Sequence, residues 1–185
     1  YDMQLASAAT KIFERRKEMV TRLQPIVAQY YKLLSGDRET VSLAYRTDME
    51  EGELTELLLK SREKDCILGH TTVGIHRDDI LFTIGDVPLR KYGSQGQQKS
   101  FIIALKLAQY QIIAEQTGKT PILLLDDVFD KLDESRVAEL IAIVASDRFD
   151  QIVITDCSHV RMERLLQNSG AEYKLFDVTY GKVID

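Results

Sequence analysis

The sequence predicts an α/β fold with a mostly parallel sheet core and a helical lobe. In the later part of the chain, short apolar strands at residues 122–125 and 151–156 alternate with helical patterns at residues 134–144 and 160–167. This alternation is typical of parallel strands joined by crossover helices. Near the start, apolar residues recur at three- and four-residue steps over residues 5–33, which predicts a long amphipathic helix.

Within this fold we expect residues 1–118 to form the helical lobe with small strands, and residues 119–185 to form part of the core. Pro25 is expected to kink the first helix or to begin a second one, because proline removes a helical hydrogen bond. The remaining patterns predict a strand at 41–45, a short helix at 53–64, a strand pair or bent strand at 72–84, and a terminal hairpin at 173–184 that turns near 180–181.

Composition limits the classes of function. A net charge of −5 over 185 residues excludes a generally basic nucleic-acid binder, so any such contact must be a local patch. Cys66 and Cys157 are isolated and favour a reducing compartment. The sequence has no apolar run of membrane-spanning length and no visible signal peptide, so we expect no membrane partner and a cytoplasmic location. Because the chain opens on Tyr1 within a helical pattern, we expect it to be a piece of a longer protein.

A glycine-rich turn and a pair of carboxylates carry the chemistry. The turn at residues 93–98 leads into an apolar helix, with Ser94 placed as its N-cap and Gly96 permitting close backbone approach. Such a helix start directs backbone N–H groups and positive potential towards an anion. About thirty residues further along the sequence, a buried strand ends in Asp126 and Asp127. Paired acids of this kind hold Mg²⁺ beside a phosphate, so the pattern indicates nucleotide chemistry.

A phosphate-binding loop of the form G-x-x-x-x-G-K-[ST] is missing from the sequence. Gly118-Lys119-Thr120 is the nearest match, but Ile113 stands where the first glycine is required. The tripeptide also precedes a strand, and Gly118 is better explained as a helix end. The sequence therefore predicts half of a nucleotide site.

These motifs, in this order, resemble the second half of an ATP-binding-cassette-type head of the kind found in SMC-like chromosome and repair proteins. Residues 94–98 resemble the signature motif, residues 122–127 the Walker B strand, and residues 130–133 the D-loop. Together with residues 74–79 and the opening helix, they resemble the bacterial RecF family over nearly the whole chain. The resemblance implies the C-terminal half of a P-loop ATPase head, with the half that bears Walker A and the Q-loop absent.

The resemblance also implies roles for individual residues. In such heads, ATP lies between two subunits of a head-to-tail dimer. The implied roles are the Mg²⁺ water shell for Asp126, the general-base position for Asp127, D-loop coupling of the two sites for Asp133, and signature contacts across the dimer to the partner's ATP for Ser94, Gln95, Gly96 and Gln97. The switch position, commonly histidine, is Asp156 here, and His159 substitutes for it only if the turn brings its ring back to the site.

For the parent protein, the resemblance implies a slow DNA-dependent ATPase of recombinational gap repair, replication-fork maintenance and the SOS response. Its cofactors would be ATP and Mg²⁺, and the isolated chain is expected to bind neither and to be inactive. Its partners would be DNA, including gaps and single-strand/double-strand junctions, an ATP-dependent homodimer, and RecR- and RecO-like proteins.

Two other functions are consistent with the residues themselves. Asp126, Asp127, Asp130 and Asp133 would suit a metal-dependent phosphoesterase, since two-metal sites need several carboxylates. The chain would equally suit a non-catalytic interaction domain. Residues 76–79, His-Arg-Asp-Asp, would form a metal site, a polar latch or a ligand-facing turn.

Overall fold

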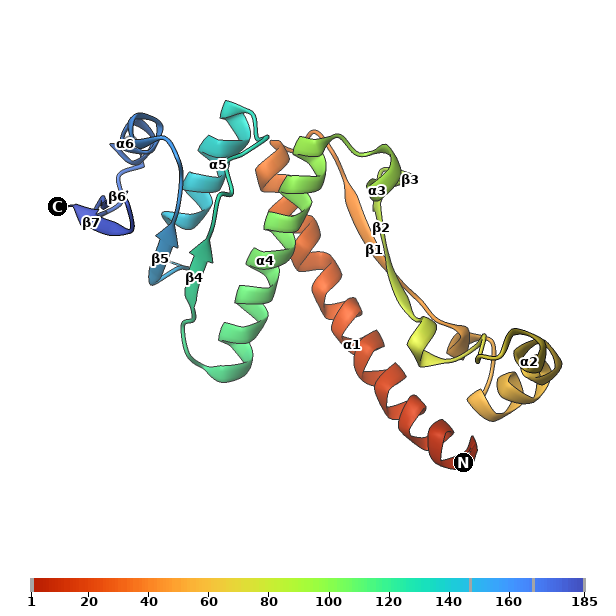
Figure 1. Cartoon of the computed structure of the whole chain (residues 1–185). Coiled ribbons are helices and arrows are strands. Elements are labelled where there is room, and N and C mark those ends of the chain that lie inside the picture. Colours follow the sequence, from red (N-terminus) through yellow and green to blue (C-terminus); the bar gives the residue numbers. More distant parts are fainter. Residues whose placement is uncertain (1, 147, 168, 185) are drawn as a thin grey trace. The chain divides into compact units, whose positions relative to one another are not determined.

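The computed structural model describes residues 2–146, 148–167 and 169–184. Its contacts divide the chain into two compact units (Figure 1). The first unit comprises Tyr1–Ile26 and Val41–Tyr92, and the second comprises Val27–Thr40 and Gly93–Asp185. These units do not coincide with the ranges 1–118 and 119–185, whose assignment to a lobe and a core stays a prediction.

The first helix, α1, runs without a break from Asp2 to Ser35 and contains Pro25. The expectation that Pro25 begins a second helix is therefore wrong, since a proline costs one main-chain hydrogen bond and its neighbours in α1 keep theirs. The buried face agrees only in part with the expected one. Of the predicted apolar stripe, Ala9, Leu23 and Tyr30 are buried, whereas Leu5, Ile12, Met19 and Leu33 are exposed. The rest of the buried face in the later turns is formed by Val20, Val27, Tyr31 and Leu34.

An antiparallel sheet organises the first unit. Strands β1 (Val41–Arg46), β2 (Asp79–Ile84) and β3 (Val87–Pro88) lie in that order. Val41 of β1 pairs with Ile84 of β2 at one end, and Arg46 pairs with Asp79 at the other. The other elements of this unit are the short helices η1 (Asp48–Glu50), η2 (Ile75–Arg77) and α3 (Leu89–Tyr92), and the longer helix α2 (Leu54–Leu68).

The prediction of a strand pair or bent strand over residues 72–84 is wrong for residues 72–78, because β2 starts only at Asp79. Gly74 has a φ of 120°, a value that interrupts an extended chain, and the 3₁₀ turn η2 follows it directly. The Asp78 side chain accepts hydrogen bonds from Arg16 and Tyr45. The segment before β2 is therefore a polar turn.

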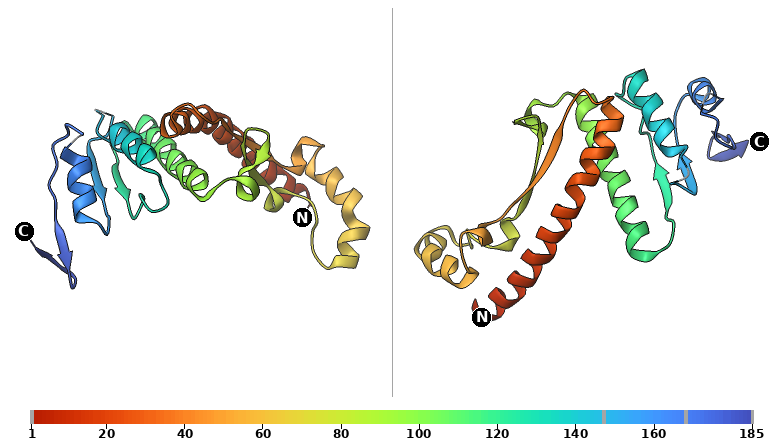
Figure 2. Two further views of the ribbon diagram at one scale, coloured as in Figure 1. Left: turned by 90° about the horizontal axis from the view of Figure 1, so that it is seen from above. Right: turned by 180° about the vertical axis from the view of Figure 1, so that it is seen from behind.

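The second unit contains the expected alternation of strands and helices. Its elements are α4 (Gln95–Thr117), β4 (Ile122–Leu125), α5 (Glu134–Val144), β5 (Gln151–Ile154), α6 (His159–Gln167), β6 (Asp177–Thr179) and β7 (Lys182–Ile184). β4 and β5 pair in parallel, as predicted for the core. β6 and β7 form the predicted C-terminal hairpin, which turns at Tyr180-Gly181 (Figure 2).

Burial of the parallel pair is one-sided, although a buried strand was expected before Asp126. In β4, Leu123 and Leu125 are buried, whereas Ile122 and Leu124 are 58% and 69% exposed. The α4 helix is likewise buried along one face, and its Ile102 and Ile113 are exposed. Because successive strand residues point to opposite sides, a two-stranded sheet packed on one side leaves every second residue uncovered.

Among the described helices, none is both long enough and apolar enough to cross a membrane.

Candidate functional site

The carboxyl ends of β4 and β5 meet at one edge of the parallel sheet. Leu125 is opposite Ile154, so Asp126 and Thr155 follow their strands side by side. The Thr155 hydroxyl donates to Oδ1 of Asp126 at 2.5 Å and accepts the backbone N–H of Asp127 at 3.1 Å. Thr155 thus holds the side chain of Asp126 and the backbone of Asp127, and both acids are exposed. Ligands of open α/β sheets bind at this edge.

Asp127 has an unusual backbone that is held from two sides. Its φ of 47° lies in the left-handed region, which aspartate and asparagine tolerate better than most residues. Its carbonyl oxygen accepts a hydrogen bond from Nζ of Lys99 at 3.0 Å. Since Lys99 lies in the first turns of α4, this bond ties the predicted signature helix to the turn that carries the acids.

The start of α4 is a complete capping box. Oγ of Ser94 accepts the backbone N–H of Gln97 at 3.2 Å, and Oε1 of Gln97 accepts the backbone N–H of Ser94 at 2.7 Å. The capping role predicted for Ser94 is therefore confirmed. The first-turn N–H groups of Gln95 and Gly96 have no intrahelical acceptor, as at any helix start, and Ser94 and Gln95 are exposed.

Gly96 lies against the predicted D-loop. A methyl group in place of its hydrogen would lie 3.1 Å from the carbonyl oxygen of Lys131, so the backbone of residues 130–133 approaches the helix closely. Asp133 ends that loop as the N-cap of α5, where its Oδ1 accepts the backbone N–H of Arg136 at 2.9 Å. The structure thus brings the predicted signature turn, the acids and the predicted D-loop together in one unit.

Asp156, at the predicted switch position, has its side-chain partners within the chain. The Asp156 side chain is fully buried, accepting the backbone N–H of Ser158 at 2.6 Å and pairing with Arg161. His159 bonds through Nδ1 to Asp177 of β6 at 2.8 Å. The turn therefore does not bring the His159 ring back to the acids.

The turn at residues 74–79 is a polar latch within the first unit. Asp78 accepts hydrogen bonds from Arg16 at 2.7 Å and from the Tyr45 hydroxyl at 2.5 Å, and its side chain is 3% exposed. Asp79 instead pairs with Arg46 across the sheet, at 3.2 Å. The two adjacent acids thus serve separate partners, which contradicts the metal interpretation.

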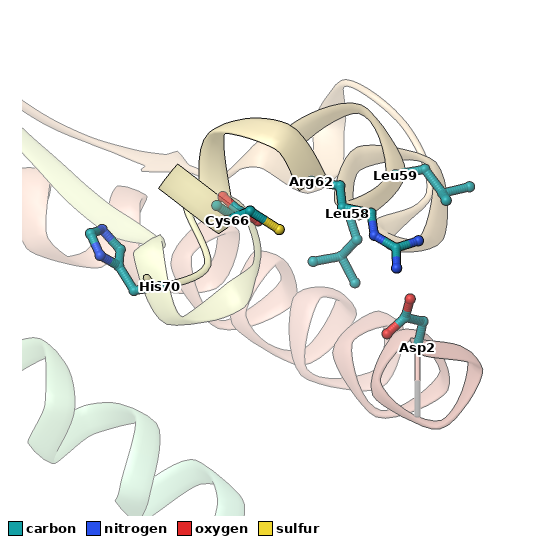
Figure 3. Close-up of a pocket in the computed structure, with 7 residues that line it drawn as sticks. Asp2, Leu58, Leu59, Arg62, Cys66 and His70 are labelled. Carbon is teal, nitrogen blue, oxygen red and sulfur yellow. The ribbon is translucent and has the colours of Figure 1, made fainter. Parts of the chain in front are cut away.

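A hollow of about 410 Å³ lies elsewhere in the first unit, between the start of α1 and α2 (Figure 3). Arg62 and Asp2 bring opposite charges to it, and Leu58, Leu59, Cys66 and His70 also line it. It contains none of the predicted site residues.

Comparison with curated proteins and solved structures shows which known proteins the chain is similar to. No protein-family model matches the chain. It is 42% identical over 184 residues to the DNA replication and repair protein RecF of Bacteroides thetaiotaomicron, and the match covers 99% of this chain and 50% of that protein. The RecF proteins of Parabacteroides distasonis (44% identical, 98% and 50% covered) and Phocaeicola vulgatus (40%, 100% and 50%) match similarly. The chain belongs to the RecF family. It spans about half the length of the curated relatives it matches.

Two solved RecF structures agree with this assignment. The structure of the recombination mediator protein RecF-ATPrS in the RecFOR pathway superposes with a TM-score of 0.72 at 26% identity, over 98% of this chain and 48% of that one. The corresponding RecF-ATP structure gives a TM-score of 0.69 at 27% identity, over 85% and 44%. The predicted fold, that of the C-terminal half of a RecF-type ATPase head, is confirmed.

The phosphoesterase hypothesis is not supported. Within the described ranges, no three His, Cys, Asp or Glu side chains are grouped so that they could hold a metal ion, and Asp126, Asp127, Asp130 and Asp133 all lie in those ranges. Two of these acids already have other structural partners, because Asp126 accepts from Thr155 and Asp133 caps α5. A two-metal site would need them to converge.

Sequence reasoning missed three residues that hold the site together. Thr155 was not singled out, although a hydroxyl directly after a parallel strand faces the same edge as the acids. Lys99 and Arg136 sit in helices and carry no local signal.

The contact between His159 and Asp177 predicts a pH dependence at the C-terminal hairpin. The hydrogen bond and the negative charge of Asp177 raise the pKa of His159 above its ordinary value of 6.5. A raised pKa in the folded state means that the contact stabilises the hairpin fully below pH 6.5 and less as the pH rises through the raised value. Amide hydrogen exchange of β6 and β7, corrected for the intrinsic pH effect, should therefore be faster at alkaline pH.

Asp177→Asn is the control for this effect. It should return the pKa of His159 towards the ordinary value, measured by NMR titration, and should remove the pH dependence of exchange in β6 and β7. Corrected exchange rates that are equal on both sides of the titration in the unaltered chain would contradict the assignment.

Proposed function

We propose that this chain supplies the Walker B, D-loop and signature parts of a RecF-type DNA-binding ATPase, whose phosphate-binding loop lies outside the chain. One observation carries the proposal. The exposed acids at the end of β4 and the exposed start of α4 are tied to each other by the bond from Lys99 to Asp127 and by the approach of Lys131 to Gly96. An anion-binding helix start and metal-binding acids are the two halves of a nucleoside-triphosphate site.

The residues present fit ATP and Mg²⁺. Asp126 is an exposed carboxylate anchored through Oδ1 by Thr155, which suits an ion that keeps most of its water ligands. When bound, Mg²⁺ would neutralise charge on the transferred phosphoryl group. Asp127, in the next position, would orient the attacking water and accept its proton.

The signature turn would act across a dimer. In the proposed head-to-tail arrangement, Ser94 and the N–H groups of Gln95 and Gly96 would face the γ-phosphate held by a second subunit. Gln97 would act by shaping the turn, because its amide is engaged at both ends within the chain. Asp133, exposed at the start of α5, would couple the two sites.

For the parent protein, this proposal includes slow ATP hydrolysis, ATP-dependent homodimerisation, and binding to gapped DNA or to junctions of single and double strands. The relatives are DNA replication and repair proteins, and the matched structures belong to a pathway that its name links to RecO and RecR. We therefore propose RecR- and RecO-like partners and a cytoplasmic site of action in recombinational repair.

Calorimetry with Mg-ATP tests the half-site directly. The isolated chain should show no saturable binding at micromolar nucleotide, because it has no phosphate-loop lysine and backbone cradle. The parent protein, with its phosphate loop, should bind with one nucleotide per subunit. One-to-one binding by the isolated chain would overturn the proposal.

A further inference from the structure

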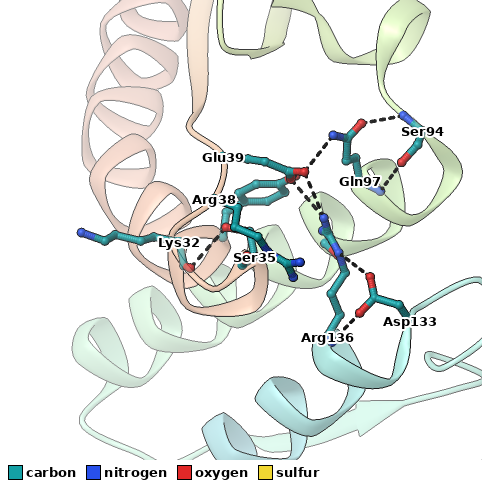
Figure 4. A network of polar contacts seen from close by, with 10 residues as sticks. Lys32, Ser35, Arg38, Glu39, Ser94, Gln97, Asp133 and Arg136 are labelled. Carbon is teal, nitrogen blue, oxygen red and sulfur yellow. Dashed lines mark hydrogen bonds and ion pairs between the residues drawn. The ribbon is translucent and has the colours of Figure 1, made fainter.

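Arg136 is a buried cation that joins three elements of the second unit. Arg136 is only 6% exposed, and arginine is almost never fully buried unless its charge is paired. Its Nε bonds to Oδ2 of Asp133 at 3.2 Å, and its Nη1 bonds to Oγ of Ser100 in α4 at 2.9 Å. Its Nη2 bonds to both oxygens of Glu39, at 3.1 and 3.2 Å (Figure 4).

Glu39 is the second centre of this network. Besides Arg136, it accepts the Tyr31 hydroxyl at 2.6 Å and Nε2 of Gln97 at 2.9 Å. Burial by itself raises the pKa of the Glu39 carboxyl, but the hydrogen bonds from Tyr31, Gln97 and Arg136 outweigh burial and hold the pKa below its ordinary value. Glu39 is therefore a carboxylate at neutral pH, and both of its oxygens are used.

The network continues from Glu39 to the signature turn. The amide of Gln97 donates to Glu39 at one end and accepts the Ser94 N–H at the other, at 2.7 Å. An unbroken line of hydrogen bonds thus runs from Asp133 through Arg136, Glu39 and Gln97 to Ser94, as Figure 4 shows. Asp133 and Ser94, its two ends, are exposed, whereas Arg136 in the middle is buried.

We propose that Arg136 and Glu39 are positioning residues that transmit a displacement of the D-loop at Asp133 to the signature turn at Ser94. This inference rests on the proposed function for the meaning of those two ends. The physical reason lies in the middle of the line. Asp133 cannot move away while Arg136 stays in place without leaving a buried charge less well paired, so Arg136 follows and carries Glu39 and Gln97 with it.

NMR of the chain itself tests the link without reference to ATP. Asp133→Asn keeps an N-cap oxygen but removes the charge that attracts Arg136. It should shift the backbone amide resonances of Ser94 and Gln97. In an Arg136→Lys background, which keeps the positive charge but loses the planar fork, the same change should shift them much less. Equal shifts in both backgrounds, or no shift in either, would overturn the link.

Two further variants keep this test interpretable. Glu39→Gln preserves the shape and should uncouple the ends as Arg136→Lys does, so it replaces Arg136→Lys if that variant does not fold. Arg164→Lys is the matched control, because Arg164 pairs with Glu134 on the surface at 3.4 Å. It should leave the response of Ser94 and Gln97 to Asp133→Asn unchanged. Loss of the response in this control would count against a specific path.

The parent protein tests what the link does. Arg136→Lys should leave ATP binding by each subunit within about twofold of the unaltered protein and weaken ATP-dependent dimerisation by about tenfold, the lower range of allosteric couplings. Unchanged dimerisation in this variant would overturn the transmission role. If the unaltered parent does not dimerise with ATP, the proposed function fails, and the NMR result still decides whether the ends are linked.

Discussion

In the intact parent protein, Asp127→Asn will lower the rate of ATP hydrolysis by about 10²–10⁴-fold, the usual contribution of a general base, and will leave Mg-ATP binding in place. The substitution removes the base and keeps the shape. Asparagine tolerates the left-handed backbone at φ 47° as aspartate does. The bonds to Thr155 and Lys99 use the Asp127 backbone, so they survive the change. Phosphate release and calorimetry on the same samples measure the two properties.

Asp126→Asn is the matched comparison, because it makes the same chemical change one residue earlier. It should weaken the Mg²⁺-dependent part of nucleotide binding, since Asp126 supplies the charge that attracts the ion's water shell. The Thr155 hydroxyl can still donate to an amide oxygen at this position, which limits the structural cost. Equal loss of nucleotide binding in the two variants would contradict the separate roles.

In the same protein, Ser94→Arg will abolish ATP-dependent dimerisation while each subunit still binds ATP. The residue is exposed at the start of α4, so a long side chain is accommodated in the monomer but enters the closed interface of the dimer. The capping box loses its acceptor in this variant, at a cost of about 1 kcal/mol in the free energy of unfolding. Sedimentation with and without ATP measures the dimer.

Ser94→Ala separates the cap from the interface. It removes the same acceptor and should cost the same ~1 kcal/mol, but it adds no bulk and should leave most of the ATP-dependent dimer. If Ser94→Arg forms ATP-dependent dimers as abundantly as the unaltered protein, the role across the interface is wrong and Ser94 is only a helix cap.

The features that were predicted correctly have local causes. Ser94 and Gly118 mark the two ends of α4 because a hydroxyl acceptor and a left-handed glycine act within one turn of their own position. The parallel pairing of β4 with β5 follows from the helix between them, since a crossover of this length returns the chain in the same direction. The hairpin at Tyr180-Gly181 likewise needs only its own residues.

The features that were missed depend on partners far apart in the sequence. Arg136 and Glu39 are separated by 97 positions, and no periodicity links them. Thr155 acts on Asp126 only because two strands end in register. The burial errors have a related cause. The sequence of an apolar strand is the same whether one or both of its faces are covered by other elements. Ile122 and Leu124 were therefore expected to be buried.

A mixture of the Ser94→Arg and Asp127→Asn parent proteins tests the central claim that one subunit's signature completes the other's site. Each head-to-tail dimer would have two sites. In the mixed dimer, one site pairs the intact acids of the first variant with the intact signature of the second, and the other site carries both defects. The account predicts that the mixture hydrolyses ATP well above the summed rates of the separate variants and regains part of the ATP-dependent dimer. A rate equal to that sum at every mixing ratio would contradict the account.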